Sequence, residues 1–260
     1  MIRFEDPAGR ADGSGQDPQN PQNSQGPQNS PSPQDSQSPR SRPGATGPSD
    51  SAELWSVTAS DTRFSGRVVS VRSDRVRAAS GEQFTRDVVV HPGAVAIVAV
   101  DEADRVVVVH QYRHPVGQRL WEVPAGLLDV AGEDPAFAAA RELAEETHLA
   151  ATDWRVLADP FTSPGMTTEA IRVYLARGLS VPDGPAWVGA DEEADMPVSR
   201  VPLADLVDGV LAGRLHNPAL VTGVLAAWVA RTQPGWDSLR RVDAPWPVWP
   251  VPTPRAGAHD

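Results

Sequence analysis

The chain contains no cysteine, and this absence removes several classes of protein at once. Without cysteine there is no disulfide framework, no cysteine-ligated zinc site and no thiol nucleophile. A cysteine-free chain fits a reducing compartment, so we expect a cytoplasmic location. The N-terminal sequence MIRFEDPAGR agrees with this expectation, because it has no apolar core of the kind that a secretory signal needs.

Long apolar runs and an excess of positive charge are also missing. No apolar run reaches about 18 residues, so we expect no membrane-spanning helix. Acidic residues outnumber basic ones by 34 to 23, which gives a net charge of −11. Such a balance disfavours non-specific binding to nucleic acid, and we expect no nucleic-acid partner. An acidic protein that binds a phosphate ester needs a metal ion or local arginines to hold it.

Composition divides the chain into four parts. Residues 1–50 form a Pro/Gln/Asn/Ser-rich tract with an imperfect PQNS repeat, which we expect to be a disordered extension. A β-rich region follows at 51–92, and an α/β domain at 93–232. The tail at 233–260 is rich in Pro and Trp and is expected to be irregular. Its tryptophans have two possible docking places, the body of the same chain or a second subunit.

The folded part predicts an α/β protein with a mixed β-sheet between helices and a small N-terminal β region. Runs rich in Val, Ile, Thr and aromatic residues predict strands; they occupy residues 53–59, 64–78, 84–93, 93–101, 104–113, 120–126, 154–165 and 169–179. The runs at 93–101 and 104–113 are nearly continuous in apolar residues, which indicates burial on both faces. Helices are expected at 203–215 and 218–232, the second capped by Asn217.

One stretch, residues 121–149, organises the rest of the chain. A glycine-bearing loop leads into a helix, with Asp134 as the expected N-cap and Pro135 at the first helical position. Small and apolar residues at helical spacing predict the face of this helix that packs on the sheet; they are Phe137, Ala140 and Ala144.

The last turns of this helix concentrate negative charge. Glu142 and Glu146 are four residues apart and lie on one side of the helix, and Glu145 flanks the same edge. Like charges at this spacing repel by a few tenths of a kcal/mol, and acids near a helix C-terminus also oppose its dipole. A hard divalent cation would remove this conflict, because Mg²⁺ takes carboxylate, phosphate and water oxygens as ligands.

The stretch resembles the Nudix box, whose pattern is G-x5-E-x7-R-E-U-x-E-E-x-G-U, with U aliphatic. The matching residues are Gly126, Glu133, Arg141, Glu142, Leu143, Glu145, Glu146 and Leu149. Two departures stand out. Six residues, not five, separate Gly126 from Glu133, and His148 replaces the second glycine of the pattern. That glycine belongs to a left-handed helix end, where another residue costs on the order of 1 kcal/mol.

Sequences around the box are similar to the bacterial ADP-ribose pyrophosphatase branch of this family, with the strongest likeness to actinobacterial members. The similar runs are HPGAVAIVAV, QYRHPVG, WEVPAG and SPGMTTE, and the likeness covers about residues 65–232. Pro164, 16 residues after His148, matches a marker proline of the branch. The resemblance implies Mg²⁺- or Mn²⁺-dependent hydrolysis of ADP-ribose to AMP and ribose 5-phosphate. It also implies a homodimer in which the N-terminal β region of one subunit completes the site of the other.

The resemblance assigns roles to individual residues. It implies that Glu142 and Glu146 are the main metal ligands, with Glu145 as a third ligand or water holder. The backbone carbonyl of Ala125 is implied as a further ligand. Glu133 and Arg141 are expected to pair and to keep the loop and the helix in register, next to Gly126, the first residue of the box.

Catalysis and substrate binding fall outside the box. The family takes its general base from a mobile loop after the box, and here Glu193 is the expected base with Glu192 in reserve. Arg113 matches a residue that contacts phosphate or ribose, and Glu122 matches a substrate-contacting glutamate. Arg86 and Trp55, in the N-terminal β region, are expected to clamp the adenine across the dimer.

Two other readings remain open. The same carboxylates would serve a Nudix hydrolase for another nucleoside diphosphate compound, such as a sugar nucleotide or a dinucleotide. A non-catalytic Nudix fold could instead sense a ligand. Proteins of that kind typically lose box carboxylates or carry a DNA-binding domain, whereas every box carboxylate is present here.

Overall fold

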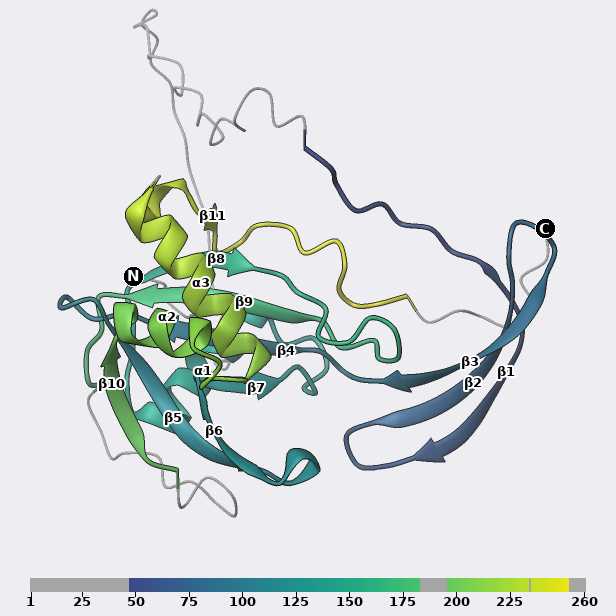
Figure 1. Ribbon diagram of the computed structural model, residues 1–260, viewed down its shortest axis with the longest axis horizontal. Coiled ribbons are helices and arrows are strands. Elements are labelled where there is room, and N and C mark those ends of the chain that lie inside the picture. The colour runs from purple at the N-terminus through teal and green to yellow at the C-terminus, as the bar shows by residue number, and fades with distance from the viewer. Residues whose placement is uncertain (1–46, 183–195, 234, 253–260) are drawn as a thin grey trace, which may run out of the picture. The chain divides into compact units, whose positions relative to one another are not determined.

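A computed structural model describes residues 47–182, 196–233 and 235–252 of the chain (Figure 1). Residues 47–54 are exposed and have no helix or strand. The described residues from Trp55 onward belong to one compact unit. None of the helices in the described ranges is long and apolar enough to cross a membrane.

The predicted N-terminal β region is present, and it forms an antiparallel three-stranded sheet. Its strands are β1 (Ser56–Ser65), β2 (Ser70–Arg77) and β3 (Gln83–Val90), in that order. Most of their side chains are exposed. Asp74 is an exception: it is 2% exposed and bonded to Ser60 and Arg72.

Two further sheets form the body. The five-stranded sheet has the order β11-β8-β9-β4-β7; its strands are Arg240–Arg241, Asp153–Ala158, Ile171–Arg177, Ala94–Ala99 and Ala125–Leu127. It is mixed, because β4 and β9 run parallel and its other neighbours run antiparallel. The three-stranded sheet has the order β10-β5-β6; its strands are Val198–Pro202, Arg105–Arg113 and Gln118–Glu122. A 3₁₀ turn, η1 (His114–Val116), links β5 to β6.

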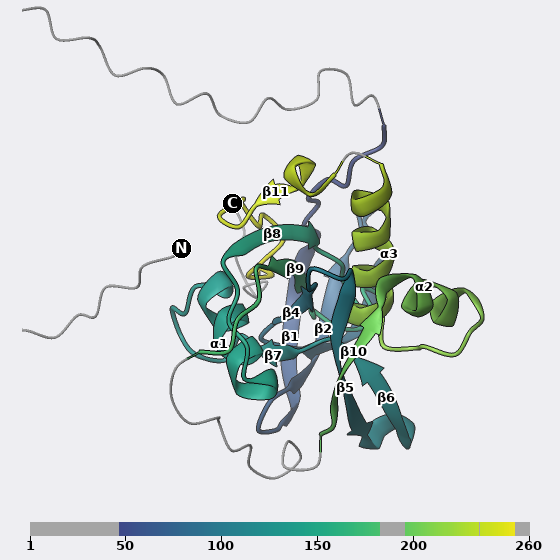
Figure 2. The same ribbon diagram turned by 90° about the vertical axis from the view of Figure 1, so that its left-hand side faces the viewer.

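Helices cover both faces of the five-stranded sheet, which confirms the predicted fold class. Figure 2 shows α1 (Pro135–Thr147) on one side of β4 and β9, and α3 (Pro218–Thr232) on the other. Alternate residues of β4 face the two layers: Val98 packs with α3 and with α2 (Leu203–Leu211), and Ile97 packs with α1. A Cβ at Gly223 of α3 would lie 2.6 Å from Val98, so this glycine permits the close approach of helix and sheet.

The predicted helix starts are confirmed. The Asp134 carboxylate accepts hydrogen bonds from the backbone N–H groups of Ala136 and Phe137, and Pro135 is the first helical residue. In α3, the Asn217 side chain accepts from the N–H of Leu220. These caps satisfy backbone donors that have no partner inside the helix.

The predicted inner face of α1 is wrong. Phe137 is 43% exposed, and the fully buried residues of the helix are Ala138, Ala139 and Leu143. Small alanines at this face let the helix approach the sheet closely, so the bulkier ring of Phe137 is left outside. Compared with the prediction, the helix is rotated about its own axis, and Glu142 lies against the edge strand β7.

The tail is more regular than predicted. After the turn η3 (Trp236–Ser238), Arg240 and Arg241 pair with β8 as the strand β11. Trp246 is 9% exposed and belongs to the same core cluster as α1. Of the two docking places left open by the sequence, the structure therefore shows the body of the same chain for Trp246.

His148 stands where the box pattern has a glycine, and replacing it measures how much this departure destabilises the fold. It ends α1 in the left-handed region, with φ 54° and ψ 40°. We expect His148→Gly to raise the free energy of unfolding by about 0.5–1 kcal/mol, because glycine adopts this conformation without strain. Urea denaturation measures the change. His216→Gly is the control, since His216 is exposed and lacks a positive φ, and it should bring no gain. Equal or lower stability of His148→Gly would contradict the account.

Candidate active site

The box residues line an open cavity of about 350 Å³ at the end of α1. Three elements supply its walls: strand β5, the loop around β7, and the exposed edge of α1. The lining residues are Gln111, Arg113, Ala125, Gly126, Leu127, Asp129, Val130, Arg141, Glu142, Glu145 and Glu146. Four carboxylates and two guanidinium groups therefore line one space, which suits a charged ligand.

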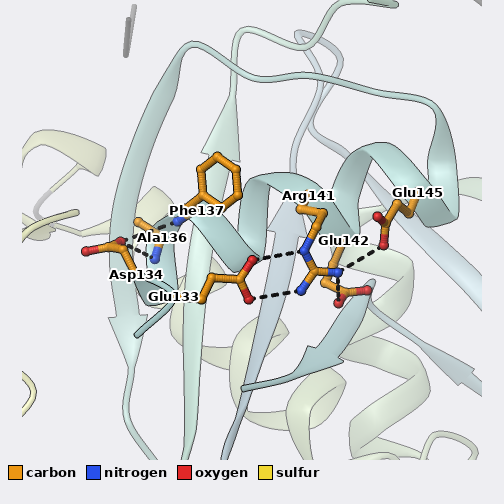
Figure 3. A network of polar contacts seen from close by, with 7 residues as sticks. All are labelled: Glu133, Asp134, Ala136, Phe137, Arg141, Glu142 and Glu145. Atoms are coloured by element: carbon orange, nitrogen blue, oxygen red, sulfur yellow. Dashed lines mark hydrogen bonds and ion pairs between the residues drawn. The ribbon is translucent and has the colours of Figure 1, made fainter. Parts of the chain in front are cut away.

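Arg141 is the centre of the polar network (Figure 3). Its Nε and Nη2 donate to the two Glu133 oxygens at 3.0 and 3.1 Å. Its Nη1 donates to Glu142 at 2.8 Å and to Glu145 at 3.0 Å. The structure thus brings Glu133 and Arg141 together although the loop between Gly126 and Glu133 is one residue longer than the box pattern.

The charges of this network stabilise one another. The hydrogen bonds that Arg141 donates to Glu133 raise the pKa of Arg141, and the nearby charges of Glu142 and Glu145 add to this effect against the cost of burial. The Glu133 side chain is 8% exposed and that of Arg141 is 28% exposed, so the pair is largely shielded from water. A shielded, bidentate pair is worth more than an ordinary surface ion pair.

Backbone groups of β7 join the glutamates to the loop. The N–H of Ala125 donates to Glu146 Oε2 at 3.2 Å. A Cβ at Gly126 would lie 2.1 Å from Glu142 Oε1, so glycine is needed for the helix carboxylate to lie against this strand. Glu146 therefore contacts Ala125 and Glu142 lies against Gly126, so both carboxylates are next to the Ala125 carbonyl.

This donor set fits a hard divalent cation. All its candidate ligands are oxygens, from Glu142, Glu145, Glu146 and the Ala125 carbonyl, and they line one cavity. Within the described ranges, no three His, Cys, Asp or Glu side chains already enclose a metal-sized space. Mg²⁺ does not require such a cage, because it keeps several waters and takes substrate phosphate oxygens as ligands.

Arg113 reaches the same cavity from β5. Its guanidinium forms a bidentate pair with Glu122, at 2.8 and 2.6 Å. Glu122 is 2% exposed and does not line the cavity, whereas the Arg113 side chain is 42% exposed. In this structure Glu122 therefore orients Arg113 from behind.

Trp55 and Arg86 come together around a residue that the sequence did not single out. The Trp55 ring meets Phe84 edge-on at 5.6 Å, and the Arg86 guanidinium lies 4.2 Å from the Phe84 ring centre. Neither Trp55 nor Arg86 lines the cavity of the box residues.

The sequence missed two polar residues of the cavity, Gln111 and Asp129. Gln111 is two residues before Arg113 on β5, and this spacing puts both on one face of the strand. Asp129 lies in the loop between Gly126 and Glu133, and its acidic side chain could have identified it as a candidate site residue. Glu192 and Glu193, the expected catalytic bases, lie outside the described residues.

A larger cavity, of about 500 Å³, does not involve the box. Both of its arginines already pair with carboxylates of the same cavity: Arg177 with Asp153 at 2.6 Å, and Arg231 with Asp104 at 3.0 Å. We therefore take the smaller cavity as the candidate active site, because Glu142, Glu145 and Glu146 line it together with Arg141.

Comparison with known proteins agrees with this geometry. The family model of the NUDIX domain matches residues 90–219. The solved structure of an ADP compounds hydrolase superposes with a TM-score of 0.59 at 23% identity, covering 71% of this chain and 99% of its own, which shows the fold.

Relatives are similar over most of their length. An ADP-ribose pyrophosphatase of Mycobacterium tuberculosis is 46% identical over 72% of this chain and 88% of its own. A methanol dehydrogenase activator of Bacillus methanolicus is 42% identical over 62% and 85%, respectively. An ADP-ribose pyrophosphatase of Bacillus subtilis is 37% identical over 59% and 82%. With its box carboxylates gathered at one cavity and this match along most of its relatives' length, the chain belongs to the Nudix family.

Proposed function

We propose that the protein hydrolyses the pyrophosphate bond of ADP-ribose, giving AMP and ribose 5-phosphate, with Mg²⁺ or Mn²⁺ as cofactor. The observation that carries the proposal is the cavity in which Glu142, Glu145 and Glu146 face Arg113. The 46% identity with the Mycobacterium tuberculosis ADP-ribose pyrophosphatase supports the choice of substrate.

Glu142, Glu146 and the Ala125 carbonyl would hold the metal, with Glu145 as a third ligand or water holder. When bound, the metal neutralises charge on the pyrophosphate and orients a water for in-line attack. Arg141 holds the carboxylates of Glu142 and Glu145 together, because its Nη1 donates to both. The Ala125 N–H donates to Glu146 and holds its carboxylate in place.

Arg113 binds the substrate phosphate in this proposal. A guanidinium suits phosphate oxygens, and the buried carboxylate of Glu122 holds this one in place through its Nε and Nη2. Glu122 then contributes to substrate binding through Arg113. The general base comes from the segment after β9, with Glu193 as first choice and Glu192 in reserve, acting on the attacking water.

The proposal includes a homodimer. A cavity of about 350 Å³ is near the lower end for ligand sites, and none of the described residues that line it is aromatic, so the adenine needs further walls. Trp55, Phe84 and Arg86 offer an aromatic and cationic surface of the right kind. The same N-terminal β region also exposes Phe64 of β1 and Val68 of the turn between β1 and β2, at 57% and 43%, which favours contact with a second copy.

Two alternatives differ in observable ways. A Nudix enzyme for another nucleoside diphosphate would use the same carboxylates and prefer a different leaving group. A ligand-sensing module would bind without turnover, and the similarity to a protein named as a methanol dehydrogenase activator keeps this reading in view. The complete set of box carboxylates favours an enzyme.

A substrate panel with Mg²⁺ tests the proposed activity. ADP-ribose, ADP-glucose, NADH and diadenosine polyphosphates are compared by kcat/KM, with the phosphate products identified. We expect ADP-ribose to dominate, giving AMP and ribose 5-phosphate. Preference for another compound would show that ADP-ribose is not the substrate, while metal-dependent hydrolysis would still be supported. Absence of turnover with all four kinds of compound would favour the ligand-sensing module.

Glu146→Gln tests the metal site. We expect kcat to fall by at least about 100-fold, because an amide is a poor ligand for a hard cation, while the fold is retained. The neutral amide oxygen can still accept from the Ala125 N–H. Glu102→Gln is the control, since Glu102 is exposed and lines the other cavity. Near-normal turnover in folded Glu146→Gln would exclude Glu146 as a ligand.

Light scattering tests the dimer. We expect the parent protein to have twice the mass of one chain, and Phe64→Asp to shift it toward the monomer with loss of activity, because the charge opposes burial of the sheet. Leu211→Asp, at a residue 74% exposed on α2, should leave both unchanged. A fully active monomeric parent would refute the shared site.

A further inference from the structure

The described tail, residues 235–252, crosses the molecule as a strap; we use this name for it below. It starts beside β9, where Arg177 lies 5.6 Å from the Trp236 ring centre. Figures 1 and 2 both show β11 alongside β8, and Arg240 and Arg241 are the paired residues. The strap then leaves the sheet edge toward the start of β4.

A buried arginine anchors the middle of the strap. Arg172 of β9 is 3% exposed and donates to the carbonyls of Ala244 and Pro245 at 2.7 and 3.0 Å. The same guanidinium pairs with Asp159 and lies 4.8 Å from the Trp246 ring centre. A buried guanidinium needs partners for its donors, so releasing the strap would leave Arg172 under-satisfied.

The end of the strap holds the link between β3 and β4. Trp249 stacks on Trp246, with ring centres 5.1 Å apart and planes at 21°. Its indole N–H donates to the carbonyl of Pro92 at 2.9 Å. Gly93 has φ +93°, and a Cβ there would lie 2.5 Å from the Trp249 nitrogen, so both the backbone and the contact require glycine at this position.

This link is continuous with the loop of the box. The carbonyl of Gly93 accepts from the N–H of Leu128 at 3.1 Å. In the next residues, Ala94 pairs with Leu127 and Ala96 with Ala125. Strand β7 is at the edge of its sheet and has β4 as its one neighbour there, so the start of β4 sets where β7 lies.

We propose that the strap positions the metal-holding loop from behind. Trp249 fixes Pro92 and Gly93, which in turn fix the pairing of β4 with β7. That pairing directs the Ala125 carbonyl into the cavity and the Ala125 N–H toward Glu146. Trp249 is therefore a positioning residue that acts through the backbone. The inference rests on the proposed metal site and does not depend on the identity of the substrate.

Two variants of the full chain separate the contacts of Trp249. Trp249→Phe keeps an aromatic ring for stacking and removes the donor to Pro92, whereas Trp249→Ala removes both. Their controls are Trp228→Phe and Trp228→Ala, at a tryptophan of α3 that is 38% exposed and outside the strap. The readouts are amide hydrogen exchange at Leu128 and the Kd for Mn²⁺ measured by electron paramagnetic resonance.

We expect Trp249→Phe to speed exchange at Leu128 and to raise the Kd for Mn²⁺, each by about threefold to tenfold, as for loss of one neutral hydrogen bond. Trp249→Ala should change both readouts more than Trp249→Phe does. In Trp249→Phe, amide exchange in β9 should stay at the rate of the parent protein. The Trp228 variants should match the parent.

Two results would overturn the proposal. Unchanged exchange at Leu128 and unchanged Mn²⁺ affinity in Trp249→Ala would show that the loop does not depend on the strap. A uniform rise of exchange through β9 and α3 in Trp249→Phe would show that the strap only adds global stability. Neither readout uses a substrate, so a failure of the ADP-ribose assignment would leave this test intact.

Discussion

The shared guanidinium of Arg141 is the interaction on which the site depends. Without it, Glu142 and Glu145 would repel each other at the end of a helix whose dipole already opposes negative charge. Arg141 relieves this repulsion, ties the helix to the box loop through Glu133, and leaves the carboxylates at the cavity surface. These contacts also raise the pKa of Arg141.

The scaffold holds this network at a sheet edge. Ala138, Ala139 and Leu143 bury the side of α1 that faces the sheet. Glu142 is four residues after Ala138, so it lies on the same side of the helix, against β7. Glycine at 126 lets Glu142 lie against that strand. On the other face of the sheet, α3 covers β4 and β9 and has no part in the cavity. Chemistry and stability are thus separated between the two helical layers.

Local signals in the sequence predicted much of this arrangement. Asp134 and Asn217 cap their helices as expected, since capping involves neighbours along the chain. The inner face of α1 was predicted wrongly, because spacing gives a helical stripe but not which stripe meets the sheet. The strand β11 and the burial of Glu122 depend on contacts between distant residues, Arg240 with Val156 and Glu122 with Arg113, which no local pattern contains. The cavity residues of the box were predictable because one loop and one helix supply most of them.

The most direct test of the account is a crystal structure with bound Mn²⁺, in which anomalous scattering locates the metal. The account predicts a peak in the cavity of about 350 Å³, with Glu142, Glu146 and the Ala125 carbonyl as protein ligands and Arg141 still bonded to Glu133. A peak in the cavity of Asp101 and Asp104, or no peak while Arg141 still bridges Glu142 and Glu145, would contradict it.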